Sequence, residues 1–200
     1  MSEHKGWYWP RHLPHRDEPG LVQAITFRLD DSLPRSWLRQ RAYFQGTPED
    51  DWALEHRLLD QGLGSCLLMD SRAAEIVEQS LLFGDGTRYV LLAWVVMPNH
   101  VHVLIETVEG WPMSRVIGGW KSFSARCINA ALARTGPLWG REYHDRYVRD
   151  EVHLGKAVYY AHNNPVAAGL VDHPEAWPYS SARRVDDVWT PFHMPYASRP

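Results

Sequence analysis

Residues 89–106 read YVLLAWVVMPNHVHVLIE, and this stretch decides the fold. Two runs of apolar and β-branched residues flank Pro98-Asn99, a pair typical of a tight turn, so we predict a β-hairpin. Side chains on a strand point alternately to its two faces, which places His100 and His102 on the same face. Two imidazoles on one face can bind one metal ion, although such histidines more often belong to a polar sheet face or a hydrogen-bonded core.

The segments around this hairpin predict alternating strands and helices. Strands are expected where apolar, β-branched or aromatic runs lie between turn residues, at 21–29 and 143–149. Helices are expected where apolar residues recur at helical spacing near a capping residue, at 72–83, 114–134 and 151–163. Pro165 is expected to end the last helix, because proline lacks the N–H that a helix interior needs.

The resulting order is strand, helix, strand, strand, helix, strand and a final helix. It predicts an α+β fold with a ferredoxin-like split βαβ core and an antiparallel sheet, with helices on one face and the histidines on the other, free face. Residues 32–70 are predicted to form a helical insertion, with a short helix over 51–59. The chain would be one domain over 1–184, with an irregular arm at 1–20 and an irregular C-terminal tail that continues over 185–200.

Length and composition fit one ordinary globular domain. The 200 residues are 44% hydrophobic and 22% charged, and no apolar run approaches the roughly 20 residues needed to span a bilayer. The N-terminus lacks the apolar core of a signal peptide. Cys66 and Cys127 lack metal-site spacing, so we expect buried thiols rather than a disulfide. A cytoplasmic protein without membrane contact is predicted.

Charge is unevenly distributed along the chain. The net charge of −3 argues against a nucleic-acid partner, because phosphate contacts need Lys and Arg. Residues 111–150, however, carry seven basic and three acidic side chains, and this block lies between the His pair and Tyr160. A solvated charged face is the commoner explanation of such a block, and phosphate binding is the functional one.

Tyr160 and Asn164 form a second pair of candidate functional residues. They are four residues apart on a predicted helix and therefore share one helical face. A tyrosine at a helix end is usually structural, and Asn before Pro often closes a helix. Beside a metal-binding His pair, a tyrosine can attack a phosphodiester if a nearby cation or base assists its phenol. The predicted topology allows a strand and a helix to bring the two pairs together.

Longer motifs resemble the HUH single-strand transposases, and among them the REP-associated tyrosine transposases. The histidine motif and the tyrosine motif in that order make the resemblance specific, and it covers about residues 10–184. The matching segments are 93–104 (AWVVMPNHVHVL), 120–123 (WKSF), 143–151, 160–171 (YAHNNPVAAGLV) and 177–182 (WPYSSA).

This resemblance implies a metal-dependent enzyme that cuts and rejoins DNA. His100 and His102 would bind Mg²⁺ or Mn²⁺, and Tyr160 would be the nucleophile that forms a 5′-phosphotyrosine. Asn164 would be the third ligand, at a position where insertion-sequence relatives usually carry the longer Gln and the REP-associated group is expected to carry Asn. The implied partner is single-stranded or hairpin DNA with palindromic repeats.

Candidate DNA contacts are basic and aromatic residues around these motifs. Arg and Lys can position a phosphate backbone, and exposed aromatic side chains can stack on unpaired bases. For each basic residue after position 110 an ordinary surface role is about equally expected, and for the N-terminal arm it is the more expected one. The candidates are Trp9, Arg11, Arg115, Lys121, Arg126, Arg141, Arg146 and Arg149.

Three other functions stay open at this point. A catalytically silent palindrome-binding DNA protein would keep the fold without cleavage. A hydrolase of small phosphoesters would use the His pair with water as the nucleophile. A replication initiator or relaxase would share the chemistry but usually has a longer chain. A monomer and a homodimer are both compatible with the sequence, with the tyrosine acting on the His pair of its own chain or of a second copy.

Overall fold

The computed structural model describes residues 3–10, 13–41 and 47–184. Its centre is a four-stranded antiparallel sheet with the strand order β4-β5-β3-β6. The strands are β3 (Val22–Arg28), β4 (Tyr89–Val96), β5 (His100–Thr107) and β6 (His144–Tyr147). The predicted α+β class and the split βαβ arrangement of the core are confirmed.

The hairpin of β4 and β5 forms where the sequence predicted it. The Met97 N–H donates to the carbonyl of His100 at 2.8 Å, so Pro98-Asn99 is a two-residue turn. On its other side β5 pairs with β3, in a register that places Thr26 directly opposite His102. Because β5 lies between β4 and β3, His100 and His102 lie in the middle of the sheet.

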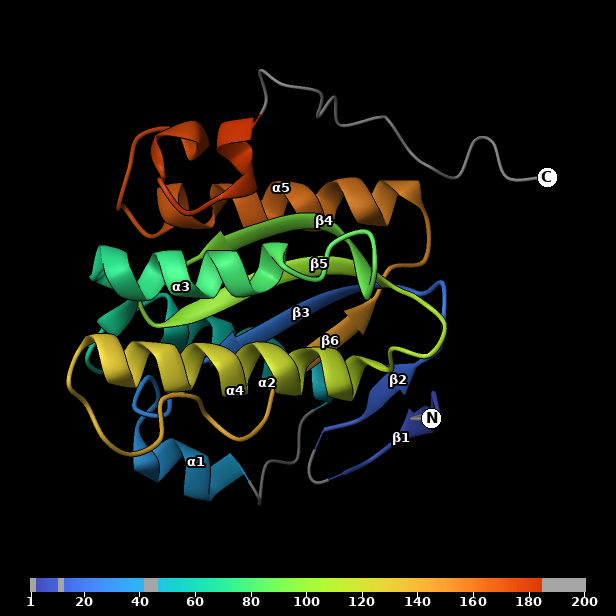
Figure 1. Cartoon of the computed structure of the whole chain (residues 1–200), viewed down its shortest axis with the longest axis horizontal. Coiled ribbons are helices and arrows are strands. Elements are labelled where there is room, and N and C mark those ends of the chain that lie inside the picture. The colour runs from blue at the N-terminus through green and yellow to red at the C-terminus, as the bar shows by residue number, and fades with distance from the viewer. Residues whose placement is uncertain (1–2, 11–12, 42–46, 185–200) are drawn as a thin grey trace.

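Two helices, α3 (Ser71–Leu82) and α4 (Met113–Ala131), cover one face of the sheet (Figure 1). The Asp70 carboxylate caps α3 by accepting the Arg72 N–H. Burial of apolar side chains between this helical layer and the strands is the main favourable contribution to folding. The buried layer includes Ile25, Phe27, Val101, Val103 and Ile105 from the sheet, and Val77, Leu81, Ile117 and Trp120 from the helices.

The opposite face of the sheet is covered as well, and the prediction of a free face was wrong. Ala161 of α5 (Glu151–Ala167) packs in a second apolar cluster with Ala93, Val95 and Leu104 of the sheet. The helix α2 (Pro48–Leu59) reaches the same face through the ring contact of His56 with His102. The sheet therefore lies between two helical layers, and the histidines of β5 are buried in the second.

α5 does not end before Pro165, as the sequence predicted, but continues to Ala167. Proline removes one intrahelical N–H, and the hydrogen bonds that follow close the turn without it. The Ala168 N–H donates to the carbonyl of Asn164, and the Leu170 N–H donates to the carbonyl of Pro165, both at 2.9 Å. The longer helix keeps Asn164 in a helical position, four residues after Tyr160.

The segment predicted as an insertion is largely helical. Besides α2 it contains α1 (Arg35–Arg41) and the 3-10 turn η1 (Leu67–Met69). α2 begins with a capping box, in which Thr47 accepts the Asp50 N–H and the Asp50 carboxylate accepts the Thr47 N–H. The predicted helix over 51–59 is confirmed, and it starts three residues earlier than expected.

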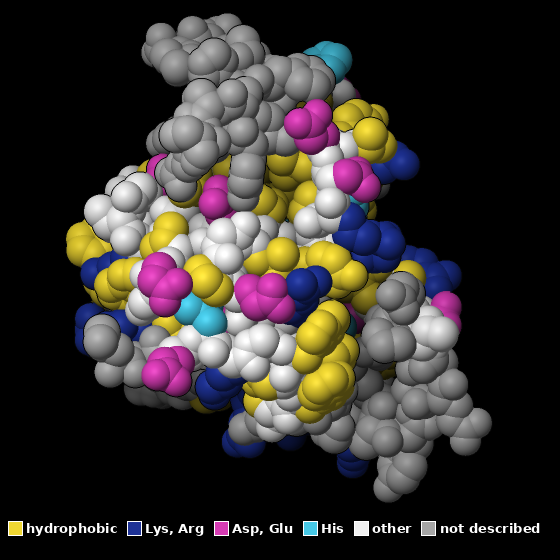
Figure 2. Space-filling view, turned by 90° about the vertical axis from the view of Figure 1, so that its right-hand side faces the viewer, with side chains coloured by type: hydrophobic (Ala, Val, Ile, Leu, Met, Phe, Trp, Pro, Cys, Tyr) yellow, Lys and Arg dark blue, Asp and Glu magenta, His cyan; other side chains and the backbone are white. Residues whose placement is uncertain are grey.

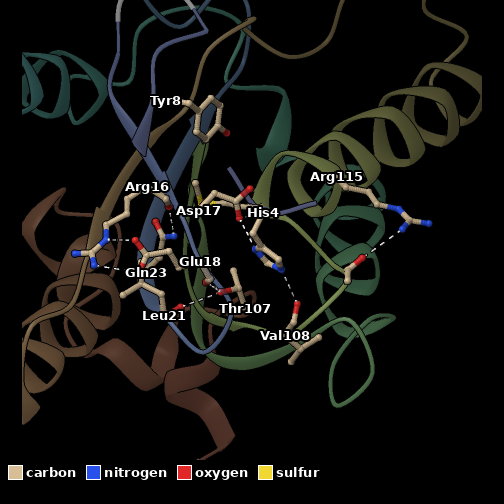
Figure 3. Close-up of polar contacts among 12 residues, drawn as sticks. His4, Tyr8, Arg16, Asp17, Glu18, Leu21, Gln23, Thr107, Val108 and Arg115 are labelled. Atoms are coloured by element: carbon tan, nitrogen blue, oxygen red, sulfur yellow. Dashed lines mark hydrogen bonds and ion pairs between the residues drawn. The ribbon is translucent and has the colours of Figure 1, made fainter. Parts of the chain in front are cut away.

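The N-terminal arm is not irregular within the described residues but forms a β-hairpin. Its strands are β1 (Gly6–Tyr8) and β2 (His15–Asp17). His4 joins its Nδ1 to the Asp17 carboxylate at 2.9 Å and its Nε2 to the carbonyl of Val108 at 3.1 Å (Figure 3). His15 forms a buried hydrogen bond with Asp145 of β6. Alternation within such short strands is too brief a signal to predict this hairpin.

The described part of the C-terminal tail closes the outer edge of β4. It contains two 3-10 turns, η2 (Pro174–Ala176) and η3 (Ser181–Arg184). The Trp177 indole donates to the carbonyl of Val96, and the Val96 N–H donates to the carbonyl of Tyr179, both at 2.9 Å. The tail up to residue 184 is thus part of the fold, while 185–200 lies outside the described residues.

Cys66 and Cys127 are half-buried free thiols rather than the fully buried ones expected. Among the described helices, none has the length and apolar character that crossing a membrane would require.

Candidate metal and nucleophile site

β5 places His100 and His102 next to each other in the interior. The two side chains are almost fully buried, their Nε2 atoms lie 2.9 Å apart, and their ring planes are at 84°. Burial lowers the pKa of His100 to about 3 and that of His102 well below its ordinary value, because the imidazolium would lose its hydration. Both rings are therefore neutral near pH 7, and each keeps one nitrogen without a proton.

The turn residue Asn99 decides which nitrogen of His100 carries the proton. Its amide Nδ2 donates to the carbonyls of Leu59 at 3.2 Å and Leu63 at 3.0 Å, which directs its Oδ1 to His100 Nδ1 at 2.7 Å. An amide oxygen accepts, so His100 Nδ1 must donate. His100 Nε2 is then left with a free lone pair that points at His102.

Asn164 of α5 approaches the facing nitrogen, Nε2 of His102. Its Nδ2 lies 3.2 Å from His102 Nε2, and its Oδ1 is buried with no hydrogen-bond partner among the described residues. Because the two ends of an amide exchange by a half-turn of the side chain, Asn164 can turn its oxygen to the same point. With the amide turned in this way, two imidazole nitrogens and one amide oxygen would meet at one point.

This donor set fits a divalent cation that accepts mixed nitrogen and oxygen ligands. Nitrogens bound at roughly 2.1 Å on adjacent corners of a coordination sphere are about 3 Å apart, close to the 2.9 Å between the two Nε2 atoms. In the described part of the chain, no cluster of three His, Cys, Asp or Glu side chains could hold a metal. Beside the two histidines, the amide of Asn164 is therefore the candidate third protein ligand at this point.

Tyr160 lies one turn before Asn164 on α5, beside the same histidines. Its ring meets that of His102 edge to face with centroids 5.5 Å apart, and its hydroxyl lies 2.8 Å from Nδ1 of His56. Burial, with the charge of Asp60, raises the pKa of Tyr160 to about 12. The phenol is therefore protonated at neutral pH until a cation or another donor favours its ionised form.

A cavity of about 270 Å³ lies in front of this tyrosine. His56, His102 and Tyr160 line it together with Trp52, Arg146 and apolar residues of β3 and α5. Trp52 and Arg146 also line a neighbouring pocket of about 190 Å³. That pocket adds Arg16 and Arg149 and the aromatic rings of Trp7 and Tyr147. A cationic and aromatic surface therefore continues from Tyr160 toward the N-terminal hairpin.

The structure separates the predicted DNA contacts into groups. Arg146 and Arg149 lie in the pocket beside the tyrosine cavity, and Trp9 stacks on Trp7 at its rim with ring centroids 6.2 Å apart. Arg115 lies over the ring of Trp111, and Arg126 over the ring of Phe123, both on α4 and so behind the opposite face of the sheet.

Two further candidates lie in or after α4, and one lies outside the described residues. Lys121 uses its ammonium group on backbone carbonyls, of which Gly140 is the nearest at 2.6 Å. Arg141 is exposed, and Arg11 lies outside the described part of the chain. On the face that Figure 2 shows, Lys and Arg side chains lie beside exposed hydrophobic ones, with Asp and Glu between them. The DNA-binding role of each candidate stays a prediction.

Sequence reasoning missed the contribution of α2. His56 and Trp52 reach the site from a segment whose sequence indicated an insertion, and Glu55 joins their helix to His144 of β6. The sequence carries no motif that links this helix to β5 or α5, and contact over about a hundred residues of separation has no periodic signal. The adjacent Glu55 and His56 in this helix were the available hint.

Comparisons with known proteins agree with this geometry. The family model described as "Transposase IS200 like" matches residues 70–164, a range that contains His100, His102, Tyr160 and Asn164. In this range the chain is similar to the IS200-like transposases.

The relatives specify the resemblance further. A Haemophilus influenzae protein assigned as a REP-associated tyrosine transposase is 27% identical over 103 residues, which cover 46% of this chain and 58% of that protein. The chain therefore spans just over half the length of this curated relative. A solved structure of a REP-associated tyrosine transposase bound to a REP hairpin superposes with a TM-score of 0.56 at 17% identity, over 92% of this chain and 84% of that one. The resemblance to the REP-associated tyrosine transposases is confirmed.

Proposed function

We propose that this protein is a metal-dependent single-strand DNA transposase and endonuclease. It cleaves and rejoins DNA at palindromic repeats through a 5′-phosphotyrosine intermediate. The observation that supports this most directly is the meeting of Tyr160 with the His pair and Asn164 inside one chain. That the superposed transposase holds a REP hairpin supports hairpin DNA as the substrate.

His100, His102 and Asn164 are the residues that would hold Mg²⁺ or Mn²⁺. Imidazole nitrogens suit Mn²⁺ at least as well as Mg²⁺, which prefers oxygen. When bound, the cation supplies positive charge that polarises the non-bridging oxygens of the scissile phosphate. Asn99 and the hydroxyl of Thr26 orient the two imidazoles from behind.

Tyr160 carries the covalent step. Its oxygen attacks the phosphorus, the bond to the 3′ oxygen breaks, and the DNA 5′ phosphate stays joined to the tyrosine. The phenol proton passes to water, and the released 3′ oxygen takes one up. In the reverse direction a 3′-hydroxyl attacks the phosphotyrosine, and the tyrosine oxygen leaves. No ATP is needed, because the bond energy is kept in the intermediate.

The strand would run from the tyrosine cavity into the neighbouring pocket. Arg146, which lines both, would pair with a phosphate next to the scissile one, and Arg149 would pair with a phosphate further along. Trp52 and Trp7 present ring faces on which unpaired bases can stack. Such contacts position a single strand without reading every base.

The test is incubation of the protein with Mn²⁺ or Mg²⁺ and labelled single-stranded DNA of the host's repeated palindromes. On a denaturing protein gel we expect a slower, labelled band that is absent with Tyr160→Phe and with a chelator. Mn²⁺ binding without DNA, followed by electron paramagnetic resonance, should be lost in His102→Ala and weakened in Asn164→Leu.

A different pattern would support the alternative of a catalytically silent palindrome-binding protein. That protein would retard hairpin DNA on a native gel and give no covalent band with any metal. Release of phosphate from small phosphoesters without an adduct would support a hydrolase instead.

A further inference from the structure

His56 of α2 reaches the candidate nucleophile from 104 residues away in the sequence. Its Nδ1 lies 2.8 Å from the hydroxyl oxygen of Tyr160, and the imidazole is buried. Neither the transposase motifs nor the metal ligands include this residue. The contact joins the helical insertion to the centre of the proposed chemistry.

Packing fixes the orientation of this imidazole. The ring of Trp52 lies against it with centroids 4.1 Å apart, and the ring of His102 lies at 5.0 Å. These contacts limit how far the ring can turn about its side-chain bonds. Nδ1 is therefore held toward Tyr160, and Nε2 lies in the interior.

The surroundings also indicate which ring nitrogen carries the proton. Nε2 is buried and has no hydrogen-bond partner among the residues that the structure describes. A buried N–H without an acceptor is rarer and more costly than a lone pair without a donor. The proton therefore belongs on Nδ1, which donates to the oxygen of Tyr160.

Glu55, the residue before His56, holds α2 close enough to the sheet for His56 to contact Tyr160. Glu55 accepts from Nε of Arg28 on β3 at 3.1 Å and pairs with Nε2 of His144 on β6 at 2.7 Å. All three side chains are buried. Two strands of the central sheet thus hold the helix through Glu55, and the next side chain is delivered to the tyrosine.

We propose that His56 is a further catalytic residue, which donates its Nδ1–H to the oxygen of Tyr160 and holds that oxygen for attack. This inference rests on the proposed phosphotyrosine chemistry. The donor favours the phenolate when the phenol loses its proton, and in the rejoining step it stabilises the same oxygen as the leaving group. The role needs no change in the protonation of His56 itself.

Three substitutions separate this role from a structural one. His56→Asn places an amide N–H where Nδ1 stood, His56→Gln moves the amide one bond further, and His56→Leu removes the donor. At saturating DNA and Mn²⁺, we expect His56→Leu to slow adduct formation roughly 100-fold, as for loss of one oxyanion donor. We expect His56→Asn to recover most of that loss, and His56→Gln to recover less.

The controls exclude damage to the fold, the metal site or DNA binding. Arg57→Gln, on the exposed side of the same helix, should react like the wild type. Mn²⁺ affinity, DNA affinity and thermal melting of the His56 variants should stay close to the wild type. If His56→Leu forms the adduct at the wild-type rate, the proposal is overturned. It is also overturned if the Leu and Asn variants lose the same amount of rate and both bind Mn²⁺ more weakly.

A second measurement does not depend on activity. With ¹³Cζ-labelled tyrosine, the Tyr160 resonance can be identified by its absence in Tyr160→Phe. We expect it to shift in His56→Leu and to return toward the wild-type position in His56→Asn. No shift in either variant would refute the contact. If the wild type forms no adduct but the shift is present, the contact stands and the proposed transposase chemistry fails instead.

Discussion

The hydroxyl of Thr26 lies 2.9 Å from Nδ1 of His102, because the two residues are directly opposite in the register of β3 and β5. A hydroxyl oxygen can accept the ring N–H, which leaves His102 Nε2 free to bind a cation. Asn99 does the same for His100 from the turn. The two imidazoles are thus oriented by partners from different parts of the sheet.

Replacing Thr26 by the isosteric Val should weaken Mn²⁺ binding roughly 10-fold or more, since His102 loses the group that sets its tautomer. The free energy of unfolding should fall by only about 1 kcal/mol, the usual contribution of one hydrogen bond. Thr26→Ser keeps the hydroxyl and is the matched control. Equal Mn²⁺ affinities for the Ser and Val variants, measured by calorimetry, would contradict this role.

Removing Glu55 should destabilise the fold far more than removing a surface carboxylate. Glu55→Leu leaves the guanidinium of Arg28 buried without its carboxylate partner, at a cost of about 3–5 kcal/mol. Urea unfolding measures the loss. The double variant Arg28→Met/Glu55→Leu should regain part of it, because no unpaired charge stays buried. If the double variant is less stable than Glu55→Leu, the buried charge is not the cause.

Arg146→Gln and Arg149→Gln should each reduce the salt dependence of single-strand DNA binding. Each phosphate that the protein no longer neutralises lowers the slope of log affinity against log salt by about 0.7 for a single strand. Arg72→Gln is the control, because that guanidinium pairs with Asp70 at 2.6 Å. If the slope changes for Arg115 or Arg126 variants but not for Arg146→Gln and Arg149→Gln, the DNA strand binds over α4 instead.

Lys121 predicts a pH dependence of stability. Burial, helped by the charge of Arg28, lowers the pKa of Lys121 to about 8 from its ordinary value of 10.5. Between these values the unfolded chain binds more protons than the folded one, so the contribution of Lys121 to stability rises with pH. The free energy of unfolding of the wild type minus that of Lys121→Met should therefore increase from pH 8 to pH 10.5. If urea unfolding gives the same difference in free energy at every pH, the pKa of Lys121 is not lowered in the folded protein.

The core of the fold could be predicted because its signals are local. Two apolar runs around the turn residues Pro98-Asn99 predict the hairpin, and the 3.6-residue period predicts α3 and α4. The four-residue spacing of Tyr160 and Asn164 gave their shared face without any tertiary information. Their closeness to the His pair needed only the topology.

What could not be predicted depends on contacts between distant segments. The hairpin of β1 and β2 is held by ionic and hydrogen-bonding partners such as Asp145 and Val108 rather than by its own periodicity. α5 passes through Pro165 because its burial and the following turn outweigh one missing hydrogen bond. His56 reaches Tyr160 because Glu55 anchors its helix to two strands. Apart from the turn after Pro165, these partners lie far apart in the sequence.

The pairing of the tail with β4 has a consequence during protein synthesis, when β4 leaves the ribosome before the tail does. An open strand edge invites pairing with other chains. The backbone of Val96 is satisfied by Trp177 and Tyr179, residues that leave the ribosome about eighty positions later. The edge of the strand that leads into the His pair therefore stays open to association until these later residues have been made.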